Sequence, residues 1–226
     1  MAERDGRLVG SNFLWEGDTI AGVGPITVLP AVQNGSIGCR LMERVLDRAQ
    51  SQRCVGVRLV QAAYHNRSLS IYTKLGFDAR EPLSVLQGPA LQLDLPGYAV
   101  RLATVGDLDA CNRLCLSVHG HDRSREVADA IAQGTARVVE RGGRVTGYAT
   151  NIGYFAHAVG QTNEELKALI SAAPAFAGPG FLLPTRNAEL FRWCLAHGLR
   201  VVHPMTLMSR GLYQKLAGAF LPSVLY

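Results

Sequence analysis

Residues 26–42, ITVLPAVQNGSIGCRLM, join an apolar segment to an amphipathic one through a short polar loop. The branched residues before Pro30 predict a strand. After the loop, apolar residues recur at helical spacing and predict a helix; they are Ile37, Leu41, Met42, Val45, Leu46 and Ala49. The first turn of a helix has free N–H groups and a partial positive charge. A strand, loop and helix in this order can therefore bind an anion.

The loop itself is the candidate anion site, and it consists of Gln33, Asn34, Gly35, Ser36, Ile37 and Gly38. Small residues let the backbone approach a phosphate closely. No Gly-Lys-Ser/Thr follows, so the loop is not an ATP-binding P-loop, and its glycine spacing is not that of the dinucleotide fingerprint. On the residues alone, a plain glycine-containing loop is an equally good interpretation.

The flanking sequence predicts an α/β unit. Residues 7–15 and 19–30 predict two strands joined by a hairpin turn at Glu16-Gly17-Asp18. Residues 55–62 predict a buried strand, and residues 67–75 predict a helix that Gly76 ends in the left-handed conformation. A loop-rich stretch follows and predicts a domain boundary, with domains at 1–95 and 96–226; it contains Pro82, Gly88, Pro89, Pro96 and Gly97.

The second half predicts a related unit. Residues 98–103 predict a strand, residues 107–118 and 125–133 predict helices, with Asp107 as a cap, and residues 136–152 predict a hairpin that turns at Gly142-Gly143. Residues 139–150, VERGGRVTGYAT, repeat the pattern of AERDGRLVGSNF at 2–13, and residues 181–199 echo the segment that ends at Phe77. Roughly forty residues precede this hairpin in the second unit but almost none in the first. Either the first unit is naturally short or the chain starts inside its first domain, and we favour the second interpretation, because the loss of a strand would leave an exposed sheet edge.

Two segments together resemble the GNAT superfamily of N-acetyltransferases. Residues 26–42 are similar to its acetyl-CoA motif, a strand, then Gln/Arg-x-x-Gly-x-Gly/Ala, then a helix; Gln33 and Gly38 match, and Ser36 stands where the family usually has its first glycine. Residues 66–77, NRSLSIYTKLGF, are similar to the second signature, in which Asn66, Tyr72, Leu75, Gly76 and Phe77 match. The resemblance is strong over 7–80 and weak over 98–212.

The resemblance implies a fold and an activity. The fold class is α/β (α+β), with a mixed, mostly antiparallel twisted sheet flanked by helices, in two GNAT-like units of which the first is incomplete at its N-terminus and the second degenerate. The activity is transfer of an acetyl group from acetyl-CoA to a primary amine, by direct attack in a ternary complex. The strand ending at Pro30 would diverge from its neighbour, so that backbone groups of Thr27, Val28 and Leu29 bind the acetyl carbonyl and pantetheine.

The resemblance also implies roles for two residues of the second segment. Asn66 would bind the pantetheine arm, although it can equally cap the second helix. Tyr72 would be the general acid that protonates the departing thiolate, the alternative being a half-buried structural aromatic. Glu16, His65 or water are the candidates for the base that removes the amine proton.

The second unit has a different sequence at both motif positions. Its hairpin is followed by HAVGQTNEELKALI without paired small residues, and Trp193-Cys194 stands near the tyrosine position. We expect it to shape the acceptor pocket. Four histidines are either pocket-lining or structural: His119, His121, His157 and His203.

Composition excludes several classes of protein. The chain has 226 residues, of which 48% are hydrophobic, so we expect a packed globule, and no apolar run is long enough for a membrane span. Five scattered cysteines predict reduced structural thiols rather than a metal site; they are Cys39, Cys54, Cys111, Cys115 and Cys194. We expect a cytoplasmic protein, without a metal, that acts on a small-molecule or peptide amine. An unpaired sheet edge in the first unit favours a homodimer.

Two other classes stay open. One is a non-catalytic acyl-CoA-binding module or an inactive fragment of such an enzyme, which shares residues 33–38 with the enzyme hypothesis but does not use Tyr72. The other is a nucleic-acid-binding fragment that uses the net charge of +5. Neither a recognition helix nor a stacking platform is evident in the sequence, so we expect no nucleic-acid partner.

Overall fold

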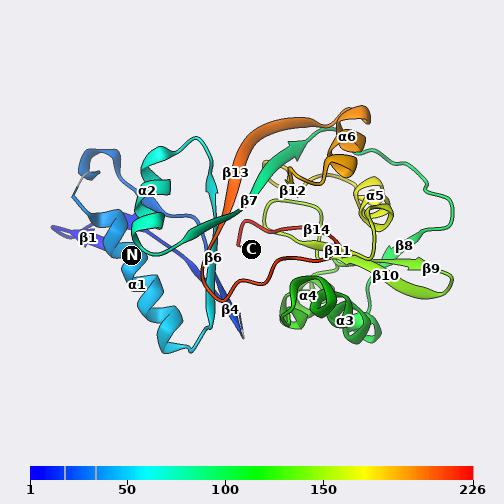
Figure 1. The fold of residues 1–226 in the computed structure, drawn as a ribbon, viewed down its shortest axis with the longest axis horizontal. Helices are drawn as coiled ribbons and strands as arrows, with labels where there is room; N and C mark the ends of the chain where they lie inside the picture. Colours follow the sequence, from blue (N-terminus) through cyan, green and yellow to red (C-terminus); the bar gives the residue numbers. More distant parts are fainter. Residues whose placement is uncertain (18, 34, 226) are drawn as a thin grey trace. The chain divides into compact units, whose positions relative to one another are not determined.

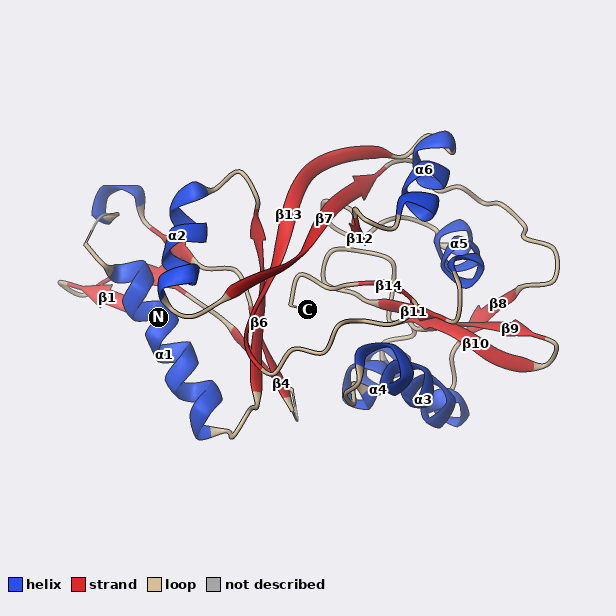
Figure 2. Ribbon diagram, in the orientation of Figure 1, coloured by secondary structure: helices blue, strands red, loops and turns tan. Residues whose placement is uncertain are grey.

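The computed structural model describes residues 1–17, 19–33 and 35–225. In these residues six α-helices flank mixed and antiparallel sheets, which confirms the predicted α/β class (Figures 1 and 2). The chain forms two compact units. The first contains Met1–Arg80, Thr206–Tyr213 and Leu225, and the second contains Glu81–Met205 and Gln214–Val224. The division into domains at 1–95 and 96–226 stays a prediction.

The first unit begins with short strands. They are β1 (Ala2–Arg4), β2 (Arg7–Ser11), β3 (Leu14–Glu16), β4 (Ile20–Val23) and β5 (Thr27–Val28). The two strands predicted for 7–15 and 19–30 were each too long, because each divides into two. The second divides near Pro25, which has no N–H to donate to a ladder. The predicted hairpin is confirmed by the antiparallel pairing of β3 with β4, while Asp18 of its turn lies outside the described residues.

The rest of the first unit contains two helices on one face of a sheet. A short 3₁₀ turn (Pro30–Val32) precedes α1 (Ile37–Ser51), and β6 (Gly56–Ala62) and α2 (Asn66–Lys74) follow. The sheet has the order β13-β6-β4-β3 in this unit, where β13 is Arg200–Gly211. The buried face of α1, formed by Met42, Leu46 and Ala49, belongs to one apolar cluster with Ala21 of β4 and Leu59 of β6. The amphipathic pattern of α1 is thereby confirmed.

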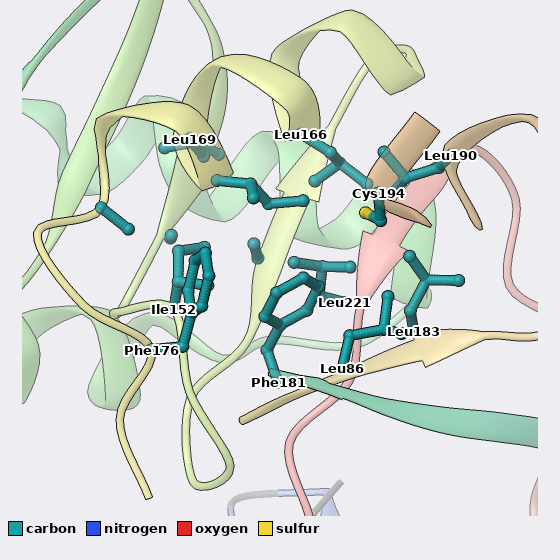
Figure 3. Close-up of a cluster of buried hydrophobic side chains, with 14 of the residues drawn as sticks. Leu86, Ile152, Leu166, Leu169, Phe176, Phe181, Leu183, Leu190, Cys194 and Leu221 are labelled. Carbon is teal, nitrogen blue, oxygen red and sulfur yellow. The ribbon is translucent and has the colours of Figure 1, made fainter. Parts of the chain in front are cut away.

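The second unit contains the remaining elements: the rest of β7 (Asp78–Gln87), β8 (Ala99–Leu102), a 3₁₀ turn (Val105–Asp107), α3 (Leu108–His119), α4 (Ser124–Ala132), β9 (Arg137–Arg141), β10 (Arg144–Ala149), β11 (Ala158–Gly160), α5 (Asn163–Ala172), β12 (Phe181–Pro184), α6 (Ala188–Ala196) and β14 (Ala219–Leu221). One sheet has the order β14-β11-β10-β9-β8, and β12 pairs with β7. Figure 3 shows side chains of α5, α6, β7, β12 and β14 converging in the core of this unit.

Two predictions in this region need correction. The loop-rich stretch that was expected from Pro82 onward is a strand until Gln87. Pro82 still contributes to the pairing, because its carbonyl oxygen accepts a hydrogen bond from Thr185 N–H (2.9 Å). Asp107 does precede α3, but its carboxylate does not cap that helix. It accepts instead from the N–H of Thr104 and pairs with Arg101.

The internal repeat is present in the structure of the hairpins. Arg4 pairs with Arg7 across a turn in which Asp5 and Gly6 have φ values of 51° and 72°. Arg141 pairs with Arg144 across Gly142 and Gly143, whose φ values are 57° and 71°. Both ladders also contain a β-bulge at the equivalent position of the repeat. The additional residue is Val9 in the first hairpin and Thr146 in the second. Matching turns and matching bulges support a duplication of this hairpin.

The second echo extends to the ends of two helices. At the end of α2, Phe77 N–H donates to the Tyr72 carbonyl (3.0 Å) around Gly76, which has a φ of 86°. At the end of α6, Leu199 N–H donates to the Cys194 carbonyl (3.1 Å) around a glycine with a φ of 84°. Both ends are Schellman motifs. Cys194 therefore occupies the position in the second unit that Tyr72 occupies in the first.

A buried polar cluster lies in the second unit. Arg123 donates two hydrogen bonds to Glu126 (2.8 and 2.7 Å), and His157 Nδ1 is 3.2 Å from Glu126 Oε2. The other ring nitrogen of His157 is 3.0 Å from the Tyr148 hydroxyl oxygen. Burial and the charge of Arg123 lower the pKa of His157, against the opposing effect of Glu126. His157 is therefore neutral in the folded protein near pH 7.

This cluster predicts a loss of stability in acid. In the unfolded chain a histidine takes up a proton near pH 6.5, whereas the buried His157 resists protonation, so the free energy of unfolding falls as the pH drops. We expect His157 to account for up to ~1.3 kcal/mol of the loss between pH 7 and pH 5.5. Denaturant melts of His157→Gln should show a shallower decline than wild type. The exposed His65→Gln is the control, and equal slopes for wild type and His157→Gln would contradict the assignment.

Candidate active site

The first turn of α1 has no side-chain cap. Ser36 is its N-cap residue, yet the Ser36 side chain makes no capping hydrogen bond, and no acidic residue lies in the first turn. The first intrahelical bond runs from Arg40 N–H to the Ser36 carbonyl (3.0 Å), which leaves the N–H groups of Ile37, Gly38 and Cys39 pointing out of the helix end. A side chain added at Gly38 would meet no atom within 4 Å. Among the described residues, the predicted loop therefore presents free donors and open space.

The backbone of β5 is exposed on one side. Leu29 N–H donates to the Val9 carbonyl (2.9 Å), and Ser11 is the register partner of Thr27. Backbone groups alternate sides along an antiparallel strand, so Thr27 and Leu29 face β2 while the N–H and C=O of Val28 face away from it. The side chain of Gln33 donates to that Val28 carbonyl (3.2 Å). Of the three predicted strand residues, Val28 is the one that offers its backbone to a ligand.

The expected divergence of strands is present. β4 pairs with β6 in parallel from Ile20↔Gly56 to Val23↔Leu59. β6 continues to Ala62, but in the described ranges β5 pairs with β2 alone. The structure therefore brings together the free edge of β5, Gln33, Gly35, Ser36, Ile37 and Gly38 in consecutive elements. Asn34 of the predicted loop lies outside the described residues.

The residues of the second motif lie on α2. Asn66 is exposed and is the first residue of the helix, whose N-cap position belongs to His65. Asn66 therefore does not cap α2, and its side chain faces solvent. Tyr72 is 8% exposed, and its ring packs edge-on against Phe77 with centroids 6.2 Å apart. Burial raises the pKa of the Tyr72 phenol, so it keeps its proton near neutral pH.

The two side chains considered as bases are placed differently. Glu16 accepts two hydrogen bonds from Arg48 of α1, at 2.5 and 3.0 Å. The bond to Arg48 lowers the pKa of Glu16, which makes its carboxylate a weaker base. His65 is exposed and lies against the ring of Tyr64, with centroids 5.2 Å apart. Glu16 therefore links β3 to α1 through its ion pair with Arg48.

The equivalent region of the second unit is closed. Thr162 and Glu165 form a capping box at the start of α5, in which Glu165 accepts from Thr162 N–H (2.9 Å) and Thr162 accepts from Glu164 N–H (3.2 Å). Strand β11 corresponds to β5, and the edge that is free in β5 pairs with β14 in β11. Acidic residues in the first turn and an occupied strand edge both exclude an anionic ligand that binds along the strand.

The remaining candidates have structural environments. His119 and His157 are buried with ring centroids 6.3 Å apart, and His121 lies 5.8 Å from His119. Buried Cys111 and Cys194 have pKa values raised by burial to about 12, so their thiols are unreactive. No cluster of metal-ligating side chains occurs among residues 1–17, 19–33 and 35–225. In the same residues no helix is long and apolar enough to cross a membrane.

One charged residue was overlooked in the sequence. Arg58 lies in the middle of β6 and is 1% exposed. Its guanidinium is 5.4 Å from the centroid of the Tyr213 ring, within the range of a cation–π contact. The sequence indicated this residue by an arginine within the apolar run Val-Arg-Leu-Val. Burial of a charge in such a strand costs free energy unless the charge is paired or hydrogen-bonded.

Comparison with known proteins agrees with this geometry. Residues 1–77 match the model of the acetyltransferase (GNAT) family. This part of the chain is therefore similar to the GNAT acetyltransferases. Among curated proteins none matches the sequence.

Solved GNAT structures share the fold of most of the chain. A candidate acetyltransferase from Pyrococcus horikoshii aligns with a TM-score of 0.73 at 14% identity over 95% of this chain and 73% of its own. GCN5-related N-acetyltransferases from Sphaerobacter thermophilus and Anabaena variabilis give TM-scores of 0.59 and 0.51, at 14% and 12% identity. The first covers 94% of this chain and 79% of its own, and the second covers 89% and 58%. At such identities these likenesses establish the fold alone.

Ser36 gives a direct test of the loop conformation. Its φ of 59° is left-handed, a region that costs an ordinary residue about 1 kcal/mol and glycine almost nothing. Ser36→Gly should therefore raise the free energy of unfolding by about 1 kcal/mol, or the melting temperature by about 2–4 °C. Ser70→Gly, in the helical conformation of α2, is the control and should lower stability. A lower melting temperature for Ser36→Gly would contradict the left-handed assignment.

Proposed function

We propose that the first unit is an acetyl-CoA-dependent N-acetyltransferase, which transfers the acetyl group to a primary amine by direct attack in a ternary complex. The observation that carries the proposal is the open N-terminus of α1 beside the unpaired edge of β5. The equivalent elements of the second unit are capped and paired. A GNAT domain at residues 1–77 agrees with acetyl transfer as the reaction.

Binding residues follow from the free donors. The N–H groups of Ile37, Gly38 and Cys39, with the positive end of the α1 dipole, would hold the pyrophosphate of acetyl-CoA. Gln33 would bind beside them, and the backbone of Val28 would bind the pantetheine and the acetyl carbonyl. Asn66, exposed at the start of α2, would bind the pantetheine arm. Acetyl-CoA, when bound, supplies the activated acetyl group.

The protein itself would contribute one hydrogen-bond donor and one proton donor to the reaction. Val28 N–H would donate to the carbonyl oxygen, where negative charge develops. Tyr72 holds a proton on its phenol oxygen because burial raises its pKa, and it would donate this proton to the departing sulfur. Holding both reactants together contributes the rest. Since Glu16 is ion-paired, water is the simplest acceptor of the amine proton.

A second candidate function is acyl-CoA binding without catalysis. The burial of Tyr72 favours it, because the Tyr72 ring makes the apolar contact with Phe77 that accompanies the Schellman motif of α2. The two candidates share the loop and differ in the role of the Tyr72 hydroxyl.

Tyr72→Phe separates the two functions. Removal of a general acid should lower turnover by about 100-fold while the acetyl-CoA dissociation constant stays the same. Release of CoA with a panel of small amines and peptides measures the rate, and calorimetry measures binding. Tyr64→Phe, an exposed tyrosine, is the matched control. Equal losses of rate and affinity, or no loss of either, would show that the hydroxyl is not the acid.

Gly38→Asp tests the pyrophosphate site. The carboxylate would face the phosphates and should weaken acetyl-CoA binding by at least about tenfold. The folded protein should be no less stable, because the position is open and an acidic residue is favourable in the first turn of a helix. Gly38→Ala controls for the added carbon and should bind more tightly than Gly38→Asp. Unchanged affinity in Gly38→Asp would refute the loop assignment.

A further inference from the structure

The starts of α5 and α6 line a pocket of about 510 Å³ in the second unit, which we name the α5–α6 pocket. Its walls are residues 161–163, 186–189 and 218–220, together with Pro184. A volume of this size is typical of small-molecule sites. The side-chain amides of Asn163 and Asn187 bond to each other at 2.8 and 3.1 Å, so the two helix starts are joined within the wall.

The two helix starts offer little to an anion. Thr162 caps α5 and Asn187 caps α6, each through a side-chain oxygen that accepts from a backbone N–H. The first turns also carry three acidic residues, Glu164, Glu165 and Glu189. Their charge opposes the positive end of each helix dipole. The α5–α6 pocket therefore differs in its chemistry from the uncapped start of α1.

Two of these three acidic residues lie beside cations. Lys167 donates a hydrogen bond to Glu164 and another to Glu189, the second at 2.8 Å. Hydrogen bonds from Lys167 and Asn163, with the nearby charge of Arg192, lower the pKa of Glu189. Two cations thus balance the charges of Glu164 and Glu189.

Glu165 is the third acidic residue, and it is 0% exposed. Its Oε2 accepts from the N–H and the hydroxyl of Thr162, at 2.9 and 2.6 Å. Its Oε1 is buried and has no hydrogen-bond partner among the described residues, and none of their cations pairs with it. Arg186 in the pocket wall donates to Glu81 instead, at 2.7 Å. One negative charge behind Thr162 is therefore left without a counter-ion.

The sheet makes room for this buried carboxylate. Gly147 of β10 and Gly160 of β11 are register partners. A side chain at either position would lie within 2.8 or 2.9 Å of Glu165 Cβ, so Glu165 lies across the bare backbone of both strands. From there its carboxylate reaches back to Thr162 in the pocket wall. Burial of such a charge costs free energy unless a partner compensates it.

We infer that the α5–α6 pocket binds a small molecule with one primary ammonium group, held beside Thr162 by the charge of Glu165. An ammonium group has three donors and no acceptor, which suits a carboxylate with an unused oxygen. The same charge disfavours the phosphates of acetyl-CoA. The site lies entirely within the second unit, and the inference does not depend on the proposed acetyl transfer.

Three probes of similar size test the charge of the ligand. Ethanolamine is a cation at neutral pH, ethylene glycol is neutral and glycolate is an anion. In an NMR titration of the whole chain, ethanolamine should bind at least about tenfold more tightly than ethylene glycol, and glycolate should bind least. Equal affinities for ethanolamine and ethylene glycol, or tighter binding of glycolate, would overturn the inference.

Two variants test the place of binding. Glu165→Gln removes the charge but keeps an oxygen for the Thr162 N–H, so ethanolamine should bind at least about tenfold more weakly while the affinity for ethylene glycol stays the same. Ala188→Phe keeps every charge and fills the pocket from an exposed position, so it should also weaken ethanolamine binding at least about tenfold. The control is Glu43→Gln, an exposed glutamate of α1 whose loss should change nothing.

Wild-type affinity for ethanolamine in either pocket variant would overturn the site. Binding of a second acetyl-CoA that ethanolamine displaces would also overturn it, because the pocket would then be a second cofactor site. Thermal melts confirm that each variant is folded, and Ala188→Phe alone decides the place of binding if Glu165→Gln does not fold. Absent acetyl-CoA binding in wild type would count against the proposed function and leave this inference standing.

Discussion

Pro25 has no N–H to donate, and the chain that enters it as β4, paired with β6, leaves it as β5, paired with β2. This change of partner exposes the Val28 backbone and opens the sheet beside Gly24. It also directs the chain into the loop that starts α1 without a cap. The candidate site is therefore a consequence of one interrupted ladder. Gln33 is placed by the segment that follows this interruption, whereas Tyr72 is placed by α2.

The two units show how the same hairpin supports an open and a closed site. The turns and bulges agree residue for residue, as do the ends of α2 and α6. The differences are confined to the ligand side. A loop separates Val28 from α1, whereas two residues separate Gly160 from α5, and the edge that is free in β5 is paired with β14 in β11. Cys194 stands in place of Tyr72. Loss of donors, edge and acid together is consistent with a unit that no longer binds acetyl-CoA.

Local patterns predicted much of this structure. Helical spacing predicted α2 to within a residue and the start of α1, paired glycines predicted the β9–β10 turn, and the repeat is evident in the sequence itself. Long-range pairing was not predictable, because no sequence window contains it. Much of Asp78–Gln87 has a loop-like sequence, and it is a strand because it pairs with β12. Residues 206–213 belong to the first unit, and no local pattern in the sequence predicts this. Arg58 shares this reason, since the Tyr213 ring that it contacts lies far away in the chain.

Calorimetric titration of the whole chain with acetyl-CoA tests the central claim, that a single open site lies in the first unit. The account predicts a stoichiometry of one acetyl-CoA per chain. A stoichiometry of two would show that the capped helix and paired edge of the second unit do not exclude the ligand. No heat of binding from a folded sample would show that the uncapped end of α1 is not a cofactor site, and the assignment of residues 33–38 would be contradicted.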